Sequence, residues 1–298
     1  MSTTTTPVDL RSRRELTGRP AGRRRLRLRR IPMYALVAVL LAIMVYPLLW
    51  IFLGSFKTQN EFLNNPTWAL PNSFTNFANY TDAWSSISLY LRNSVLAVFP
   101  ALALVILLGT AAGYALEVMV FRGRGSVLLL FLAGIMIPGQ MILLPLFTVY
   151  FKLHLTSTLW PLIITYTATG LPLTVFMMAT YFRSVPREVF EASTLDGASA
   201  IRSFRSVALP MMRSSVFTIA LVQFFFLWND LLIALTFTTQ DSLRTVQVGL
   251  LNFTGQFGAV EYGPTFAAIC INMLLVLVLY IFLNQRVMRG LSAGAVKG

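Results

Sequence analysis

The side chains best suited to polar chemistry in this chain gather in one segment, residues 183–213, between two long apolar runs. The segment carries Glu188, Glu191 and Asp196 among five arginines. Carboxylates and guanidinium groups form charge-assisted hydrogen bonds with oppositely charged groups. This composition suits recognition of another surface.

Residues that serve most enzymes are scarce in this sequence. His154 is the only histidine and Cys270 the only cysteine, so neither an internal disulfide nor a zinc site of the usual type can form. A Ser-His-Asp hydrolase needs an acid beside its histidine, and none lies near His154 in the sequence. The P-loop pattern G-x-x-x-x-G-K-[ST] is also absent. We therefore expect no catalytic residue, metal or cofactor in this chain.

The polar segment is predicted to form two short helices joined by a turn. Pro186 suits the first turn of the first helix, and Glu188 and Glu191 suit its positive end. The pair Asp196-Gly197 is typical of a helix end where glycine takes a left-handed conformation. The second helix has an apolar stripe at helical spacing, made of Ile201, Phe204, Ala208 and Met211.

A short amphipathic helix is marginal alone in water and needs a surface to bind. A groove on a partner protein is one such surface, and the membrane surface is another. Composition alone leaves both alternatives open.

Long apolar runs predict a membrane protein. Hydrophobic residues make up 56% of the chain and charged residues 12%, against about 25% charged in soluble domains. A helix of roughly 20 apolar residues crosses a bilayer. We predict six spans at about 33–53, 93–116, 127–150, 159–181, 216–236 and 266–283.

Several positions within these spans carry specific expectations. Asn93 or Ser94 is a plausible N-cap for the second span. Gly109 and Gly113 form a G-x-x-x-G pattern that favours close helix packing. Breaks are expected at Pro138-Gly139-Gln140 and Gly170-Leu171-Pro172, either to line a pathway or simply to kink the helices.

The distribution of basic residues predicts orientation. With the N-terminus inside, twenty of the 24 Lys and Arg residues fall on the cytoplasmic side, as the positive-inside rule requires. Both termini and residues 183–213 are then cytoplasmic. We interpret residues 1–30 as a disordered basic tail that helps to orient the first span, and not as a site for nucleic acid.

The polar segment resembles the EAA loop of ABC-importer permeases, whose pattern is E-A-A, three residues, G, nine residues, I-x-L-P. Here the matching residues are Glu191-Ala192-Ser193, Gly197 and Val207-Ala208-Leu209-Pro210. Ser193 and Val207 depart from the pattern conservatively. We call residues 183–213 the EAA loop.

This resemblance implies an all-α membrane protein with the type I ABC-importer permease fold. It also implies that the EAA loop docks on a separate ATPase subunit, that Glu191 pairs with a basic residue there and that Gly197 makes the turn. The residues assigned to the docking surface are Glu188, Glu191, Ala192, Asp196, Gly197, Ala198, Phe204, Leu209 and Pro210.

Other segments resemble the carbohydrate branch of the family, and more narrowly its maltose-type permeases. These are the two proline-glycine segments above, Trp228-Asn229-Asp230 and the ending at residues 290–298. The resemblance covers about 31–298, with a permease domain at 31–290 and a tail at 291–298. A second ATPase contact is implied for Gly294, Ala295, Val296, Lys297 and Gly298.

The resemblance further implies a bacterial plasma-membrane complex. Its other members would be a second homologous permease, two ATP-binding cassette subunits that bind ATP and Mg²⁺, and an extracellular sugar-binding protein. Two alternatives remain, namely an ABC permease for peptides or amino acids and an ATP-independent secondary transporter.

Asp230 is the ionisable residue that falls well inside a predicted span. Such a group is costly in a membrane and suggests a function. With Asn229 it could line the sugar pathway, or it could pair with a neighbouring helix near the outer end of the span. Both interpretations stay open.

Overall fold

The computed structural model describes residues 31–253 and 260–295. The chain divides into two units, residues 1–50 and 51–298. The first unit contains most of α2 (Ile31–Gly54), a helix without charged residues that holds Pro47. The predicted basic tail, residues 1–30, lies outside the described residues.

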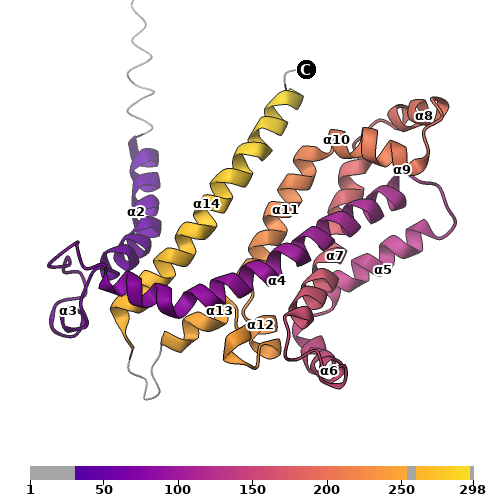
Figure 1. Ribbon diagram of the computed structural model, residues 1–298. Coiled ribbons are helices and arrows are strands. Elements are labelled where there is room, and N and C mark those ends of the chain that lie inside the picture. Colours follow the sequence, from indigo (N-terminus) through magenta and orange to yellow (C-terminus); the bar gives the residue numbers. More distant parts are fainter. Residues whose placement is uncertain (1–30, 254–259, 296–298) are drawn as a thin grey trace, which may run out of the picture. The chain divides into compact units, whose positions relative to one another are not determined.

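The described part of the second unit is helical (Figure 1). Its longest helices are α4 (Ala78–Glu117), α7 (Trp160–Arg183), α11 (Arg213–Trp228) and α14 (Tyr262–Ala295). The other segments are α3 (Gln59–Asn64), α5 (Arg124–Met136), α6 (Gly139–Lys152), α8 (Arg187–Leu195), α9 (Ala200–Ser203), the π-helical turn η2 (Phe204–Ala208), α10 (Leu209–Met211), α12 (Leu232–Phe237), the 3₁₀ turns η3 (Asp241–Leu243) and η4 (Leu250–Phe253), and α13 (Val246–Gly249).

Four described helices are long and apolar enough to cross a membrane, namely those at 32–54, 78–117, 160–183 and 262–281. Two bent pairs also pass this test. The pair α5–α6 bends by 95°, and residues 200–211 bend by 77° against α11. Counting each bent pair as one span gives up to six, which is the number predicted from the sequence.

The breaks differ from those predicted. The third span does break at Pro138, whose backbone is extended between α5 and α6. In contrast, α7 continues through Pro172, so the chain is not broken there, and the alternative of a kink stays a prediction. The fifth span is divided instead, because α11 ends at Trp228 and α12 begins at Leu232.

The predicted N-cap at Asn93 or Ser94 was also wrong. Helix α4 begins at Ala78, so both residues lie in its middle, where they are buried. The Asn93 amide donates to the carbonyl oxygens of Ser242 and Arg244 at 2.8 and 3.0 Å. The Ser94 hydroxyl accepts from the Val246 amide at 2.9 Å. Their polar groups thus bind a distant loop. The spans were predicted from runs without charged residues, and this criterion missed the more polar first half of the helix.

Helices α4 and α7 pack closely, as the G-x-x-x-G pattern predicted. A Cβ added at Gly109 would lie 2.4 Å from Cγ2 of Thr174, and one at Gly113 would lie 2.6 Å from Cβ of Met178. Both distances are shorter than side chains tolerate. Small residues at these positions therefore let the two helices approach.

Two hydrophobic clusters form the core. The larger contains buried residues of α4, α6, α7 and α11 to α14, including Trp228 and Phe237. Polar contacts inside it join helices: the indole of Trp228 donates to Asn272 at 3.1 Å, and Gln223 donates to the Gly170 carbonyl oxygen at 3.0 Å. The smaller cluster lies where the EAA loop meets α4 and α7. Its buried residues are Tyr114, Met178, Phe182, Val185, Phe190, Ala208 and Ile219.

Candidate functional site

The first half of the EAA loop is the predicted helix and turn. Helix α8 begins at Arg187, so Pro186 occupies the capping position, one residue before the predicted first turn. The prediction for Gly197 is confirmed, because its φ is +76°. Two hydrogen bonds close the turn, from the Gly197 amide to the Thr194 carbonyl oxygen and from the Ala198 amide to that of Ser193. This is the Schellman arrangement, which ends a helix firmly.

The second half of the loop departs from the predicted stripe. The helix passes through the π-helical turn η2 between α9 and α10, which shifts the helical register. As a result Phe204 and Ala208 pack in the smaller cluster, whereas Ile201 is 67% exposed and Met211 is 47% exposed. The prediction that all four share one face was therefore wrong.

Tyr114 of α4 joins the loop to the helices beneath it. Its ring centroid lies 5.6 Å from that of Phe182 in α7, 6.0 Å from that of Phe190 in α8 and 5.1 Å from that of Phe204 in η2. Edge-on and tilted ring contacts at these distances are favourable. Three segments therefore meet on one buried side chain at the end of α4.

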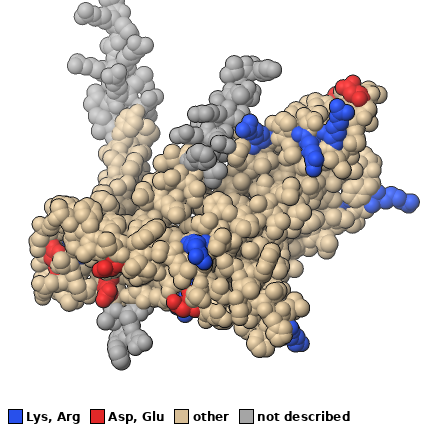
Figure 2. Space-filling view, viewed as in Figure 1, with Lys and Arg blue, Asp and Glu red and all other residues tan. Residues whose placement is uncertain are grey.

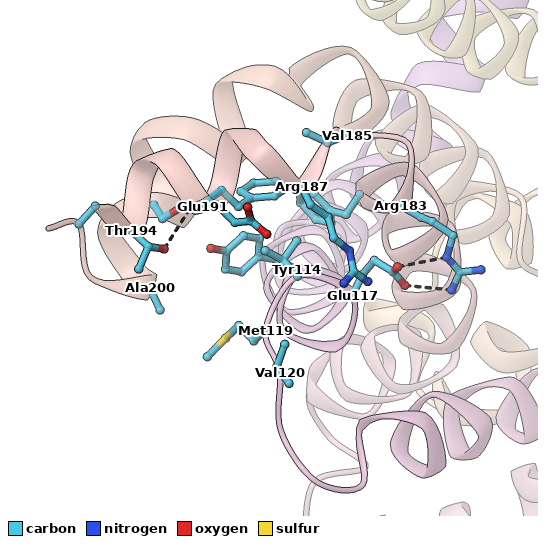
Figure 3. A pocket seen from close by; sticks show the side chains of 15 residues that line it. Tyr114, Glu117, Met119, Val120, Arg183, Val185, Arg187, Glu191, Thr194 and Ala200 are labelled. Atoms are coloured by element: carbon cyan, nitrogen blue, oxygen red, sulfur yellow. Dashed lines mark hydrogen bonds and ion pairs between the residues drawn. The ribbon is translucent and has the colours of Figure 1, made fainter. Parts of the chain in front are cut away.

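A pocket of about 470 Å³ lies beside this aromatic group, and its lining includes Glu117, Arg183, Arg187 and Glu191. Figure 3 shows side chains of α4, α7 and α8 around it, with Glu191 on the same side as Tyr114. At its edge Arg183 pairs with Glu117 through two hydrogen bonds of 3.1 and 2.9 Å. Among residues 32–253 and 260–281, whose side chains the structure describes, no basic side chain lies within ion-pair distance of Glu191. This carboxylate is thus exposed and available to a basic group.

The predicted docking residues fall into two sets. Glu188, Glu191, Ala192, Asp196, Gly197 and Pro210 are exposed, and Ala198, Phe204 and Leu209 are half-buried. Two apolar side chains that are not among the nine docking residues are more exposed than any of the half-buried set: Leu195 is 88% exposed and Ile201 is 67% exposed. In Figure 2 the end of the molecule formed by α8, α9 and α10 carries both acidic and basic side chains. This surface therefore offers charges together with exposed leucine and isoleucine.

Sequence reasoning missed three residues that build this site. They are Tyr114 and the two members of the ion pair, Glu117 and Arg183. Glu117 is the first charged residue after an apolar run and Arg183 is the first after another. Two opposite charges at the ends of packed helices could have suggested the pair. Tyr114 gave no such signal, because its role depends on contacts with three segments distant in sequence.

Asp230 lies between α11 and α12 and binds groups of its own chain. Its carboxylate accepts from the Tyr166 hydroxyl and from the Ala234 amide, each at 3.0 Å. It also accepts from the Ile233 amide at 3.4 Å. Asp230 therefore caps α12, while its neighbour Asn229 is exposed.

The predicted C-terminal contact is only partly described. Gly294 and Ala295 belong to the last turn of α14. Val296, Lys297 and Gly298 lie outside the described residues. Their role stays a prediction.

Comparison with known proteins gives three consistent findings. The family described as "binding-protein-dependent transport system inner membrane component" matches residues 106–286. The chain is 35% identical over 267 residues to the diacetylchitobiose uptake system permease protein NgcG of Streptomyces coelicolor, covering 89% of this chain and 88% of that protein. It is 30% identical over 263 residues to the trehalose/maltose transport system permease protein MalG of Thermococcus litoralis, covering 88% and 95%.

The fold also matches a solved structure. This is the crystal structure of a bacterial ABC transporter involved in the import of the acidic polysaccharide alginate. The TM-score is 0.77 at 18% sequence identity, and the match covers 88% of this chain and 97% of that chain. At this identity the likeness concerns the fold alone.

Proposed function

The chain belongs to the family of binding-protein-dependent transport system inner membrane components, and from this premise we propose that it is the permease subunit of an ATP-driven sugar importer. Membership makes it a multi-pass inner-membrane transport component. The related permeases for diacetylchitobiose and for trehalose and maltose support a sugar as substrate. The carbohydrate-branch motifs in the sequence support the same substrate class.

In this proposal the chain works in a complex. A second homologous permease completes the translocation pathway, two ATPase subunits bind ATP and Mg²⁺, and an extracellular binding protein delivers the sugar. Both termini and the EAA loop face the cytoplasm, where the ATPase subunits lie. The C-terminal residues 294–298 form a second ATPase contact.

The observation that carries the proposal is that one side of the EAA loop is packed on the protein and the other side is exposed. Its inner side is fixed on α4 and α7 through Tyr114 and Phe182, while Glu188, Glu191 and Leu195 remain exposed. An exposed leucine beside carboxylates that have no ion-pair partner among the described side chains suits a partner surface with an apolar groove and basic residues. The ATPase subunit provides such a groove, and Glu191 pairs with a basic residue in it.

In this proposal, the contacts of Tyr114 couple the ATPase subunit to the helices of this chain. ATP binding closes the ATPase dimer and moves the docked EAA loop. Because Tyr114 of α4 contacts Phe190 and Phe204 of the loop and also Phe182 of α7, the movement passes to these two packed helices. The spans then change between inward-open and outward-open states, so two distant sites share one conformational equilibrium.

Reconstitution tests this proposal. The chain is purified with its co-purifying subunits and placed in proteoliposomes that contain ATP, and uptake of labelled diacetylchitobiose, trehalose and maltose is measured. We expect uptake of at least one sugar only when both ATP and the binding protein are present. ATP-driven uptake of peptides or amino acids alone would favour the first alternative. Uptake by the isolated chain under an ion gradient would favour a secondary transporter.

A further inference from the structure

We propose that Asn229 and Gln247 form a pair of amides that binds hydroxyl groups of the transported sugar. The proposal rests on the function proposed above, because it concerns the substrate of that same pathway. It begins at the break between α11 and α12 (Figure 1). A break leaves backbone groups of the helix without their usual partners, and in transporters such groups are buried in protein or line a polar cavity.

The two amides lie together at this break. Gln247 of α13 donates to the Trp228 carbonyl oxygen at 3.2 Å and to the Asn229 side-chain oxygen at 3.4 Å. The Asn229 amide donates to the Phe225 carbonyl oxygen at 3.0 Å. Each amide group has two donors and two acceptor sites, so this arrangement leaves hydrogen-bonding capacity on both side chains. Sugar hydroxyls can act as donors and as acceptors, which matches what the pair offers.

The surrounding structure fixes the position of Gln247. The neighbours Val246, Val248 and Gly249 are buried, whereas Gln247 is half-buried. The Val246 amide binds Ser94 of α4 at 2.9 Å, and a Cβ on Gly249 would lie 2.1 Å from the Tyr90 ring. Binding groups held by such contacts need little reorganisation when a ligand arrives.

Asp230 has a different role in this arrangement. Its carboxylate is already bound by Tyr166 and by two backbone amides of α12. We therefore assign it to positioning of the break, and assign sugar contact to the amides. This separates two neighbouring residues that the sequence could not distinguish.

The test compares Asn229→Ala and Gln247→Ala with Gln240→Ala in the complete reconstituted transporter. Gln240 is an exposed amide on the same stretch of chain whose side chain binds Ser157, so it controls for loss of an amide. Loss of one or two ordinary hydrogen bonds weakens binding by roughly tenfold. We expect sugar uptake about tenfold lower in each of the first two variants, with a changed order of preference among the three sugars. Subunit assembly and ATPase activity stimulated by the binding protein should stay within about twofold, and Gln240→Ala should behave as wild type.

The outcomes separate the two proposals. If wild type transports sugar and both variants keep its rate and its order of preference, the amide pair is wrong while the proposed function stands. Loss of assembly or of stimulated ATPase activity in step with uptake would also overturn the pair, because the residues would then be structural. Absence of sugar uptake by the wild-type complex overturns both proposals.

Discussion

Two segments of this protein are fixed to opposite halves of the same helix, α4, by different kinds of contact. The EAA loop is held at the C-terminal end through ring contacts with Tyr114. The segment 241–253 is held at the N-terminal half by hydrogen bonds from side chains such as Asn93 and Tyr90. The burial of apolar ring surface is non-directional, whereas hydrogen bonds weaken steeply when they are bent. The comparison indicates a loop that can shift slightly at one end of α4 and a fixed segment at the other.

The two segments also differ in whether their charged side chains have partners within the chain. In the segment 241–253, Asp241 pairs with Arg244 at 2.9 Å and also accepts hydrogen bonds from Tyr90 and Asn252. In the EAA loop, Glu191 is exposed and, among the residues the structure describes, has no basic partner. Charges bound within the chain stabilise its own structure, and free charges remain available to another protein. The following predictions test this distinction.

The largest effect is expected from reversing the free charge with Glu191→Lys. A cation there repels the basic residue of the ATPase that the family resemblance implies, and like charges at an interface cost several kcal/mol. We expect co-purification of the ATPase and ATP-driven uptake to fall at least about tenfold, a loss of about 1.4 kcal/mol or more. Membrane insertion should be unchanged, because the side chain is exposed.

A charge reversal elsewhere provides the control for this experiment. Asp82 is exposed near the start of α4, and Asp82→Lys makes the same change of net charge. ATPase co-purification should survive in this variant. Equal losses in the two variants would point to a general effect of charge, and wild-type uptake by Glu191→Lys would remove the role assigned to Glu191.

A smaller effect is expected at the fixed segment from Asn93→Leu. The substitution leaves the carbonyl oxygens of Ser242 and Arg244 without their donor. Hydrogen bonds of this kind contribute about 0.5–1.5 kcal/mol each to stability. Hydrogen exchange should therefore become faster across residues 241–253, while the ATPase still co-purifies.

Asn79 offers a matched control, since its amide also donates to two backbone carbonyl oxygens, those of Ser55 and Lys57. Asn79→Leu removes the same two bonds at another place and should leave exchange across 241–253 unchanged. If Asn93→Leu leaves that exchange unchanged as well, hydrogen bonds to α4 do not fix the segment. Loss of the ATPase in Asn93→Leu would contradict the separation of the two ends.

The sequence predicted the parts of this molecule that depend on local chemistry. The helical membrane fold, the family, the close approach at Gly109 and the left-handed turn at Gly197 are confirmed. What it missed depends on contacts between distant residues. The start of α4 was misplaced because Asn93 binds a loop about 150 residues away in the chain. The apolar stripe failed because the π-helical turn η2 changed the register.

Site prediction was limited by the same cause. A motif can suggest that Glu191 contacts a partner, but it cannot show that Tyr114 supports the loop, or that Asp230 is already bound by Tyr166. These facts depend on which helices pack together. The family motif therefore predicted the exposed half of the site, and packing determined the buried half.

The smallest effect is expected from the turn of the EAA loop. A side chain in a left-handed conformation costs about 1 kcal/mol relative to glycine, and an added Cβ at Gly197 meets no atom within 4 Å. Gly123 has φ +88° and is equally open, so Gly197→Ala and Gly123→Ala carry the same strain at different places. We expect similar small losses of thermal stability in both variants. The ATPase interaction should become about two- to fivefold weaker in Gly197→Ala alone, because only the strain at position 197 changes the angle between α8 and α9. Equal ATPase binding by the two variants, measured by titration in detergent, would mean that the docking surface tolerates a shifted turn and depends on Glu191 and its exposed apolar neighbours instead.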